Sequence, residues 1–412
     1  MELSTKSAGT LLKESEEDLQ TVFRSIEQVA RANQRKVLEA FWHERVAESD
    51  FNGSTGYGLD DEGRDKLERI YARVFEAQAA LVRPQIFSGT HALRLGLFGV
   101  LRPGQNVVFA TGNPYDTLEA VVGLRQAVGS LSEWGVSHKV VPMSVDGSLD
   151  LEAVVQAIDS QTKVVMFQRS RGYSDRPALT IHQLETAFRR IRPLYPDVVL
   201  AVDNCYGEFV EELEPTAVGA DLAMGSLIKN PGGGIATTGG YLVGKQEWIE
   251  QAAAQLTAPG IGREAAPTHD FLRSFYQGLF LAPHVVSQAL KGSVLAARVF
   301  EKLGLTVSPR WNEPRSDLIL SVDFEDEKRL LNFCRSVQNS APVDSYVVPQ
   351  AAPMAGYADP VVMAAGAFVQ GGSLELSADA PLRPPYRGYF QGGLTYEHVY
   401  VALEKVVSSI LE

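Results

Sequence analysis

Apolar runs and helix-forming segments take turns along the middle of this chain. Strands are expected at 107–110, 139–143, 163–168 and 198–203, and helices at 151–158 and 181–190. A strand followed by a helix and then by another strand is typical of a βαβ crossover, which joins parallel neighbours. The pattern therefore predicts an α/β fold with a mainly parallel, doubly wound sheet.

The flanking segments follow other patterns, and 412 residues are too many for one average domain. We expect residues 1–60 to form an amphipathic helical arm, because apolar side chains recur there at three- and four-residue steps. A large domain is expected over 61–280, beginning with a helix from about 61 to 81. Residues 281–412 are expected to form a smaller α+β domain, with strands at 318–322, 346–348 and 373–377 and helices at 326–337 and from 395.

Charge and composition exclude several kinds of partner. The formal net charge is −12 and the pI is near 5.2, which opposes nucleic-acid binding because that relies on clustered Lys and Arg. Two cysteines cannot form a disulfide framework, and the seven histidines lack the spacing of a zinc site, so no metal is expected. Neither a secretion signal nor an apolar run long enough to cross a membrane is apparent. We therefore expect a soluble, cytoplasmic protein.

The stretch 221–244 reads D-L-A-M-G-S-L-I-K-N-P-G-G-G-I-A-T-T-G-G-Y-L-V-G and contains Lys229. Its pattern predicts two strands joined by a loop with Ser226, Lys229 and three successive glycines. Apolar neighbours would remove water from the Lys229 amine, lower its pKa and make it a nucleophile. A lysine beside such a turn is equally often a solvated loop residue, and both interpretations stay open on this stretch alone.

Asp203 favours the chemical interpretation. It closes the apolar run that starts at Val198, so it is expected at the carboxyl end of a buried strand, where open α/β sheets hold their ligands. A carboxylate there can pair with a protonated ring nitrogen, while Lys229 can form an imine. These are the two protein groups that pyridoxal phosphate (PLP) chemistry needs.

Ser88, Gly89 and Thr90 are expected to begin a helix. Open backbone N–H groups and the helix dipole favour a phosphate there, although most helices begin with such residues. Tyr115 leaves a strand through a Gly-Asn-Pro turn, which places it to stack on a planar cofactor or to pack on the next helix.

Four arginines are candidates for binding a substrate carboxylate. Arg169 and Arg171 follow an expected strand, although paired arginines in a loop are more often solvated. Arg383 lies in a proline-rich segment that would hold it for bidentate pairing, and Arg387 competes with it.

Together these motifs resemble the fold-type I PLP enzymes. The resemblance is closest to the methionine gamma-lyase and cystathionine beta-lyase relatives known as aluminium resistance proteins. It is carried by T-G-Y-G-L-D-D-E-G-R-D, F-S-G-T-H-A, T-G-N-P-Y-D-T-L, Q-R-S-R-G-Y, V-D-N-C-Y-G-E-F, S-L-I-K-N-P-G-G-G-I-A and Y-F-Q-G-G-L-T-Y-E-H. These motifs cover nearly the whole chain after the first fifty residues, and the resemblance implies the aspartate aminotransferase-like fold.

The resemblance also implies roles for single residues. Lys229 corresponds to the lysine that forms the Schiff base with PLP, Asp203 to the partner of the pyridine nitrogen, and Tyr115 to the residue stacked on the ring. The residues that it places around the phosphate are Ser88, Gly89, Thr90 and Ser226.

Tyr57 matches a tyrosine that, in the cystathionine gamma-synthase group, reaches the phosphate of a neighbouring subunit. A homodimer or homotetramer with shared active sites is therefore expected. The sequence departs from the family at Leu59, where an arginine is common, and at Ile228, where a hydroxyl residue is common. We expect Arg64 or a backbone amide to substitute in the phosphate grip.

The resemblance implies a lyase that breaks a C–S bond of a sulfur amino acid by β- or γ-elimination, releasing a thiol, a 2-oxo acid and ammonia. An aminotransferase, or a stress-response binding protein with little turnover, is the alternative on the same fold. A P-loop is excluded by order, because its glycine run precedes the lysine and a helix follows at once.

Overall fold

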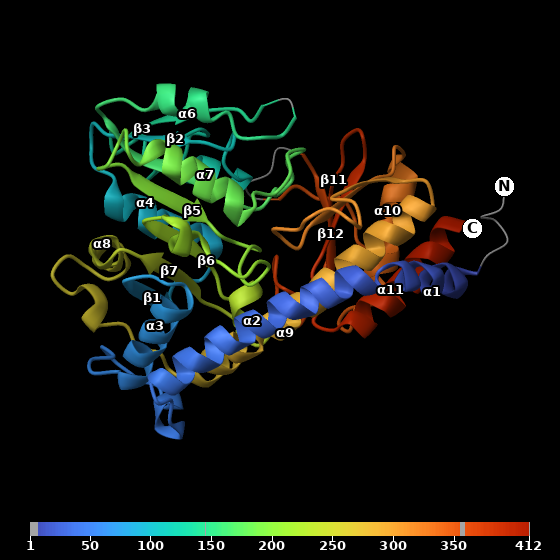
Figure 1. Cartoon of the computed structure of the whole chain (residues 1–412), viewed down its shortest axis with the longest axis horizontal. Helices are drawn as coiled ribbons and strands as arrows, with labels where there is room; N and C mark the ends of the chain where they lie inside the picture. Colours follow the sequence, from blue (N-terminus) through green and yellow to red (C-terminus); the bar gives the residue numbers. More distant parts are fainter. Residues whose placement is uncertain (1–6, 145, 355–358, 412) are drawn as a thin grey trace.

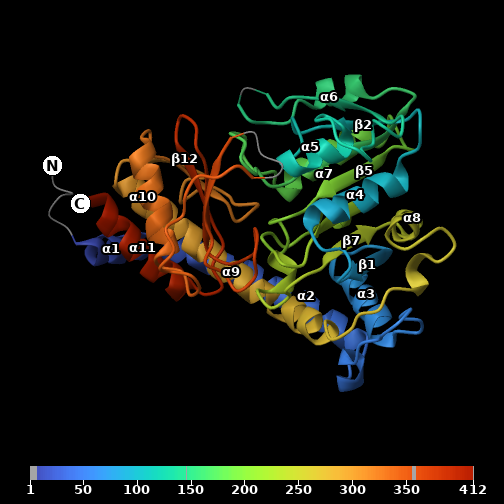
Figure 2. The same ribbon diagram turned by 180° about the vertical axis from the view of Figure 1, so that it is seen from behind.

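The computed structural model describes residues 7–144, 146–354 and 359–411, and shows two sheets connected by one long helix (Figures 1 and 2). The larger sheet has seven strands in the order β1-β7-β6-β5-β4-β2-β3. Its strands are β1 (Ala79–Arg83), β2 (Asn106–Phe109), β3 (Ser137–Val140), β4 (Thr162–Gln168), β5 (Val199–Asp203), β6 (Leu222–Ser226) and β7 (Gly240–Gly244). Strands β3, β2, β4, β5 and β6 are parallel, whereas β7 runs antiparallel to both of its neighbours, β6 and β1. The predicted doubly wound parallel sheet is confirmed.

Helices cover both faces of this sheet because its strands are apolar on both sides. Alternate side chains point to opposite faces, so Met166 belongs to one core cluster and its neighbour Phe167 to the other. The helices of the Met166 face include α4 (Gly89–Val100) and α8 (Gln246–Leu256). Those of the Phe167 face include α3 (Glu62–Val74), α6 (Leu151–Ala157) and α7 (Ile181–Ile191).

The predicted helix over 61–81 is wrong at its C-terminal end. Helix α3 ends at Val74, and the five buried residues from Ala79 to Arg83 form the edge strand β1 instead. They pair with β7 through a register that joins Leu81 to Leu242. The apolar periodicity of the helix continues into the strand, so only the partner strand reveals the change.

The second sheet is antiparallel and has the order β10-β11-β12-β9-β8. Its strands are β8 (Thr306–Ser308), β9 (Leu320–Asp323), β10 (Val361–Ala364), β11 (Ser377–Pro381) and β12 (Arg387–Gln391). Helices α10 (Glu327–Gln338) and α11 (Tyr396–Leu411) pack on one face and enclose a separate core. The strand predicted at 346–348 is absent, because these side chains are exposed, and the one predicted at 373–377 begins only at Ser377.

Helix α9 (Leu272–Lys302) runs between the two sheets, alongside α2 (Gln20–His43) (Figure 1). The predicted domain boundary at 280 falls inside α9, and α1 (Ala8–Asp18) packs on α9 and α11 at the small sheet. Among the described helices, only α9 is long and apolar enough to cross a membrane, yet 72% of its apolar window is buried in the protein. Such burial is typical of a core helix of a globular protein.

Candidate active site

Lys229 lies in the tight turn between β6 and β7, where the sequence predicts it. It immediately precedes a short 3-10 helix, Asn230–Gly232. A side chain at Gly232 would place its Cβ 1.7 Å from the Leu227 carbonyl oxygen, so only glycine allows the turn to close this tightly. The lysine is therefore fixed at the carboxyl edge of the parallel strands.

The Lys229 amine has an aromatic and acidic environment. Its Nζ lies 4.0 Å from the centroid of the Tyr206 ring, within the range of a cation–π contact. Desolvation lowers the pKa of this amine, but the nearby groups Cys205, Tyr206, Asp203 and Glu208 outweigh it and raise the pKa above its ordinary value. The expected lowering is thus wrong, because the sequence shows the apolar neighbours of Lys229 and not the carboxylates that the fold brings to it.

Asp203 is the last residue of β5 and is 8% exposed. Its Oδ1 accepts a hydrogen bond of 3.1 Å from the Cys205 backbone N–H, which orients the carboxylate toward the loop after the strand. Desolvation raises the pKa of Asp203, and the charge of Lys229 opposes that rise. Asp203 and Lys229 are therefore close enough for the charge of each to shift the pKa of the other.

Strands β5 and β6 and the start of α4 meet around Gly89. A Cβ on Gly89 would lie 3.0 Å from the Cys205 Sγ and 3.7 Å from the Ser226 Cβ. The Ser226 Oγ is buried and has no hydrogen-bond partner among the described residues. The Ser88 hydroxyl accepts from the His91 N–H, whereas the Thr90 Oγ1 lies 2.6 Å from the Thr117 Oγ1.

These features fit a phosphate. The first N–H groups of a helix lack partners within the helix, and α4 presents them beside the unpartnered Ser226 hydroxyl. The absence of a side chain at Gly89 leaves the approach open. Ser88, Gly89, Thr90 and Ser226 are therefore brought together, as the resemblance implies, and their cofactor roles stay predictions.

Tyr115 follows β2 and directly precedes α5 (Asp116–Val122). A Cβ on Gly172 would be 3.2 Å from the Tyr115 ring, so the backbone of the next loop packs directly on this tyrosine. The Tyr173 ring lies 6.3 Å from the Tyr115 ring, at an interplanar angle of 56°. Tyr115 is held by these contacts at the same edge of the sheet as Asp203.

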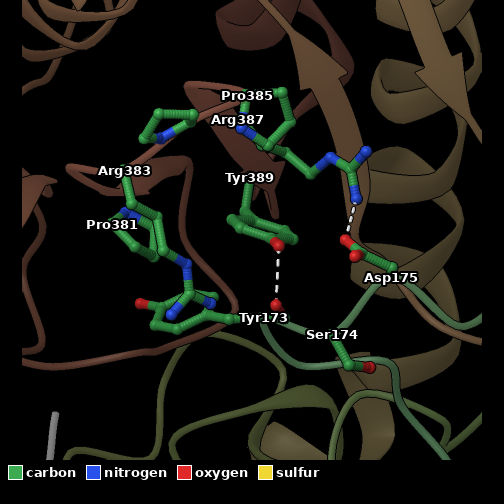
Figure 3. A pocket seen from close by; sticks show the side chains of 9 residues that line it. Tyr173, Ser174, Asp175, Pro381, Arg383, Pro385, Arg387 and Tyr389 are labelled. Atoms are coloured by element: carbon green, nitrogen blue, oxygen red, sulfur yellow. Dashed lines mark hydrogen bonds and ion pairs between the residues drawn. The ribbon is translucent and has the colours of Figure 1, made fainter. Parts of the chain in front are cut away.

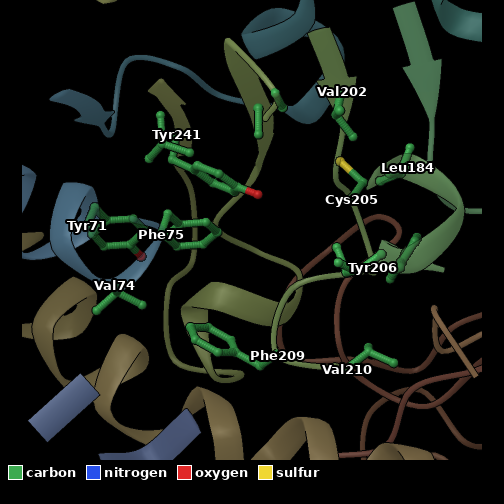
Figure 4. Close-up of a cluster of buried hydrophobic side chains, with 14 of the residues drawn as sticks. Tyr71, Val74, Phe75, Leu184, Val202, Cys205, Tyr206, Phe209, Val210 and Tyr241 are labelled. Atoms are coloured by element: carbon green, nitrogen blue, oxygen red, sulfur yellow. The ribbon is translucent and has the colours of Figure 1, made fainter. Parts of the chain in front are cut away.

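Tyr206 connects the two sheets. Its φ of 67° is unusual for a residue with a side chain, and the loop after β5 holds it there. Its hydroxyl donates to the Gly372 carbonyl at 2.9 Å and accepts from the Gln391 Nε2 at 3.1 Å. Cys205 and Tyr206 belong to the same buried core cluster as Tyr71, Phe75 and Tyr241 (Figure 4).

Two predicted substrate arginines are already engaged within the protein. Arg169 is fully buried and donates to Asn204, to the Gly207 carbonyl and to Glu211, so it holds the loop after β5. Arg171 is also buried, and it donates to the Ser308 carbonyl at 2.9 Å. That they bind substrate stays a prediction, and in this structure their guanidinium groups donate to groups of the protein itself.

Arg383 and Arg387 line a small pocket of roughly 190 Å³ next to Tyr173 (Figure 3). Arg387 forms ion pairs with Asp323 and Asp175. Arg383 has an exposed side chain and one ion pair, 2.7 Å from Asp359. Arg383 therefore exchanges partners more readily than Arg387.

Tyr57 is 82% exposed, in a loop that packs on residues 266–269. The Arg64 guanidinium is buried and donates to the carbonyl groups of Gly58 and Ala266, so it supports this loop. The suggestion that Arg64 grips the phosphate stays a prediction. Leu59 is exposed as well.

Sequence reasoning missed Tyr206, Gln391 and a second buried acid, Asp379. The first two are recognisable only from their contacts across the two sheets. Asp379 had a local signal, since the segment S-A-D-A-P alternates polar and small apolar residues as a half-buried strand does.

Comparisons with known proteins show which family this sequence belongs to. The sequence model of the methionine gamma-lyase family matches residues 8–411. The uncharacterised protein YnbB of Bacillus subtilis is 51% identical over 99% of this chain and 98% of its own length. A cystathionine gamma-synthase of Mycobacterium leprae is 30% identical over 48% of this chain and 47% of its own.

Solved structures of similar sequence also have the same fold as this chain. A Clostridium novyi structure named as a carbon-sulfur lyase involved in aluminium resistance is 45% identical, with a TM-score of 0.94 over 98% of this chain and 96% of its own. A Listeria monocytogenes structure named as a candidate cystathionine beta-lyase involved in aluminium resistance is 47% identical, with a TM-score of 0.96 over 98% and 100%. The PLP-dependent Escherichia coli protein YhfS is 18% identical, has a TM-score of 0.62 over 93% of this chain and 97% of its own, and shares the fold alone.

Proposed function

Because the chain belongs to the methionine gamma-lyase family, we propose that it is a PLP-dependent lyase that breaks a C–S bond of an amino acid. The products would be a thiol, a 2-oxo acid and ammonia. The main support is the position of the Lys229 amine over the Tyr206 ring and beside the carboxylate that ends β5.

The residues that would hold the cofactor come from four segments. The start of α4 and Ser226 would bind the phosphate, Tyr115 would lie on the ring, and Asp203 would hold a proton at the ring nitrogen. PLP, when bound, supplies an electron sink for the pair of electrons left at Cα.

Lys229 is the group that would move the proton at Cα. The nearby carboxylates favour the charged amine, so the proton that it accepts is stabilised before it is passed on. The Gln391 and Tyr206 contact closes one side of the site and restricts water near the reacting atoms. Arg383 is our candidate for the substrate carboxylate, since it can exchange its bond to Asp359.

We extend the proposal to the assembly. A tyrosine that is 82% exposed within a well-packed loop is suited to contact another chain. We propose a homodimer or homotetramer in which Tyr57 reaches the phosphate of a neighbouring subunit. The amino-acid substrate would then bind in a site that two chains share.

The test is to incubate the purified protein, loaded with PLP, with L-cysteine, L-cystathionine and L-methionine, and to assay 2-oxo acid together with the released thiol, or with released sulfide in the case of L-cysteine. A lyase releases both in equal amounts without an added acceptor. An aminotransferase would turn over only with a 2-oxo acid acceptor and would release no thiol. If none of the three amino acids yields 2-oxo acid, the lyase proposal fails.

A further inference from the structure

A second buried carboxylate, Asp379, faces the active site from the small sheet. Strand β11 alternates, and its residues Ala378 and Ala380 belong to the core under α10 and α11. Ser377 and Asp379 therefore point to the opposite face, toward the large domain. The register confirms this placement, because Ser377 is paired with Gln391, whose side chain contacts Tyr206.

Contacts on either side of Asp379 place it across the site from Lys229. The Tyr173 hydroxyl donates to the Asp379 carboxylate, and the Tyr173 ring lies 6.3 Å from Tyr115. On the other side, the Gln391 side-chain amide donates hydrogen bonds to the hydroxyl groups of Ser377 and Tyr206. The Tyr206 ring lies under the Lys229 amine. The carboxylate is thus enclosed by the same tyrosines that surround the proposed cofactor position.

The Asp379 carboxylate is incompletely satisfied. The residue is 6% exposed, and its Oδ1 has no hydrogen-bond partner among the described residues. Arg383, just after β11, and Arg387, at the start of β12, form their ion pairs with other carboxylates. A buried carboxylate with an unsatisfied oxygen is unfavourable, and a bound cation would offset that cost.

Burial raises the pKa of Asp379 to about 6, while the Tyr173 hydrogen bond and the charge of Lys229 oppose that rise. The group is therefore ionised at neutral pH. An apolar side chain end, such as the methyl group of methionine, would leave this charge unpaired, and a carboxylate end would be repelled.

We propose that Asp379 is a specificity-determining residue that binds a positively charged group at the far end of the substrate side chain. The preferred substrate is then a thioether amino acid with an ammonium group beyond the sulfur. This inference rests on the proposed lyase function and narrows its substrate class. Under this proposal, a residue of the small sheet selects the amino acid, and residues of the large sheet break the bond.

The test compares two isosteric ligands, S-(2-aminoethyl)-L-cysteine and S-propyl-L-cysteine, together with their homocysteine forms. For each we would measure kcat/KM for 2-oxo acid release and, independently, the Kd from the change in cofactor absorbance. We expect the wild type to prefer the ammonium ligand by about 10- to 100-fold, the range of a hydrogen bond between charged groups. Asp379→Asn should abolish that preference and leave the propyl ligand within threefold of wild type.

The control variant is Glu325→Gln, which removes one exposed negative charge from the same domain and should retain the preference. Equal Kd and kcat/KM for the two ligands in the wild type would overturn the inference, as would an equal loss for both ligands in Asp379→Asn with normal cofactor absorbance. If binding shows the preference but no ligand yields 2-oxo acid, the inference on Asp379 stands and the lyase reaction fails. If 2-oxo acid is released without a preference, the lyase stands and Asp379 does not select the substrate.

Discussion

The large sheet contributes to the site through loops at its strand ends, whereas the small sheet contributes through the middle of a strand. Asp203 is the last residue of β5 and Lys229 follows β6, at the edge where the parallel strands end together. Asp379 lies within β11 and is aimed at the site only because alternate residues of a strand face opposite ways. The strand ends are suited to hold a cofactor, and the strand face is suited to select what binds opposite it.

The two sheets also differ in the hydrogen bonds and charges around their buried carboxylates, Asp203 and Asp379. Asp203 accepts a hydrogen bond from the Cys205 backbone and lies near the Lys229 charge. Asp379 accepts a hydrogen bond from Tyr173, and its Oδ1 has no partner within the described part of the chain. We therefore expect changes at the large sheet to stop the reaction and changes at the small sheet to alter which amino acid reacts.

The largest expected effect is at Lys229. Lys229→Ala should lower kcat by at least about 10³-fold, because it removes both the covalent attachment and the group that moves the Cα proton. Borohydride treatment followed by peptide mapping should also show that the PLP adduct at this position is lost. Lys328→Ala, at an exposed position on α10, is the matched control and should keep full activity. Activity of the Lys229 variant within tenfold of wild type would contradict our assignment.

Asp203→Asn comes next, with an expected fall in kcat of about 10²- to 10³-fold, as when one strong electrostatic group is removed from a transition state. The comparison is Asp379→Asn assayed with S-propyl-L-cysteine, where the fall should stay below threefold. The two variants make the same chemical change to carboxylates on opposite sheets. Equal losses would show that the two sheets do not divide the tasks as we suggest.

Arg383→Gln should raise KM about tenfold or more, in keeping with the loss of a hydrogen bond between charged groups, and should change kcat less. Arg387→Gln is the matched variant on the same sheet. Since Arg387 is paired with both Asp323 and Asp175, its loss should lower Tm and leave KM within about twofold of wild type. The reverse pattern of KM and Tm would assign the substrate carboxylate to Arg387.

The smallest expected effect is on stability. The pKa of Asp379 is near its ordinary value of 3.8 in the unfolded chain and about 6 in the folded protein, so its charged form opposes folding once the pH rises above about 4. That opposition grows up to about pH 6 and is constant above it. Asp379→Asn should therefore raise the Tm of the protein by about 1–3 °C at pH 8 and leave it unchanged at pH 4. Thermal unfolding of both forms across this range is the measurement, and a lower Tm of the variant at pH 8 would contradict the prediction.

Local patterns were sufficient for much of the large sheet. The strands before Asp203 and Lys229 are short, apolar and bounded by turns, so their ends could be placed within a few residues. Strand β1 could not be separated from the helix before it, because its first four residues are apolar on both faces and only pairing with β7 identifies the strand.

The arginines show why site residues were harder to predict than strands. Arg169 and Arg383 both follow apolar runs in loops, and their sequences do not show which will be buried. In the fold, the loop after β5 surrounds the Arg169 guanidinium, whereas Arg383 remains exposed beside Tyr173. The same limit explains the wrong direction for the pKa of Lys229, since its acidic neighbours come from another strand.

The sequence by itself determined the parallel sheet, the turn that holds Lys229 and the strand end that holds Asp203, because hydrophobic periodicity and glycine turns act over a few residues. Only the tertiary structure decided which arginine stays exposed, in which direction the pKa of the Lys229 amine shifts and that Asp379 faces the site. Those properties depend on burial and on charges brought together from distant segments, and neither is encoded in the residues next to them.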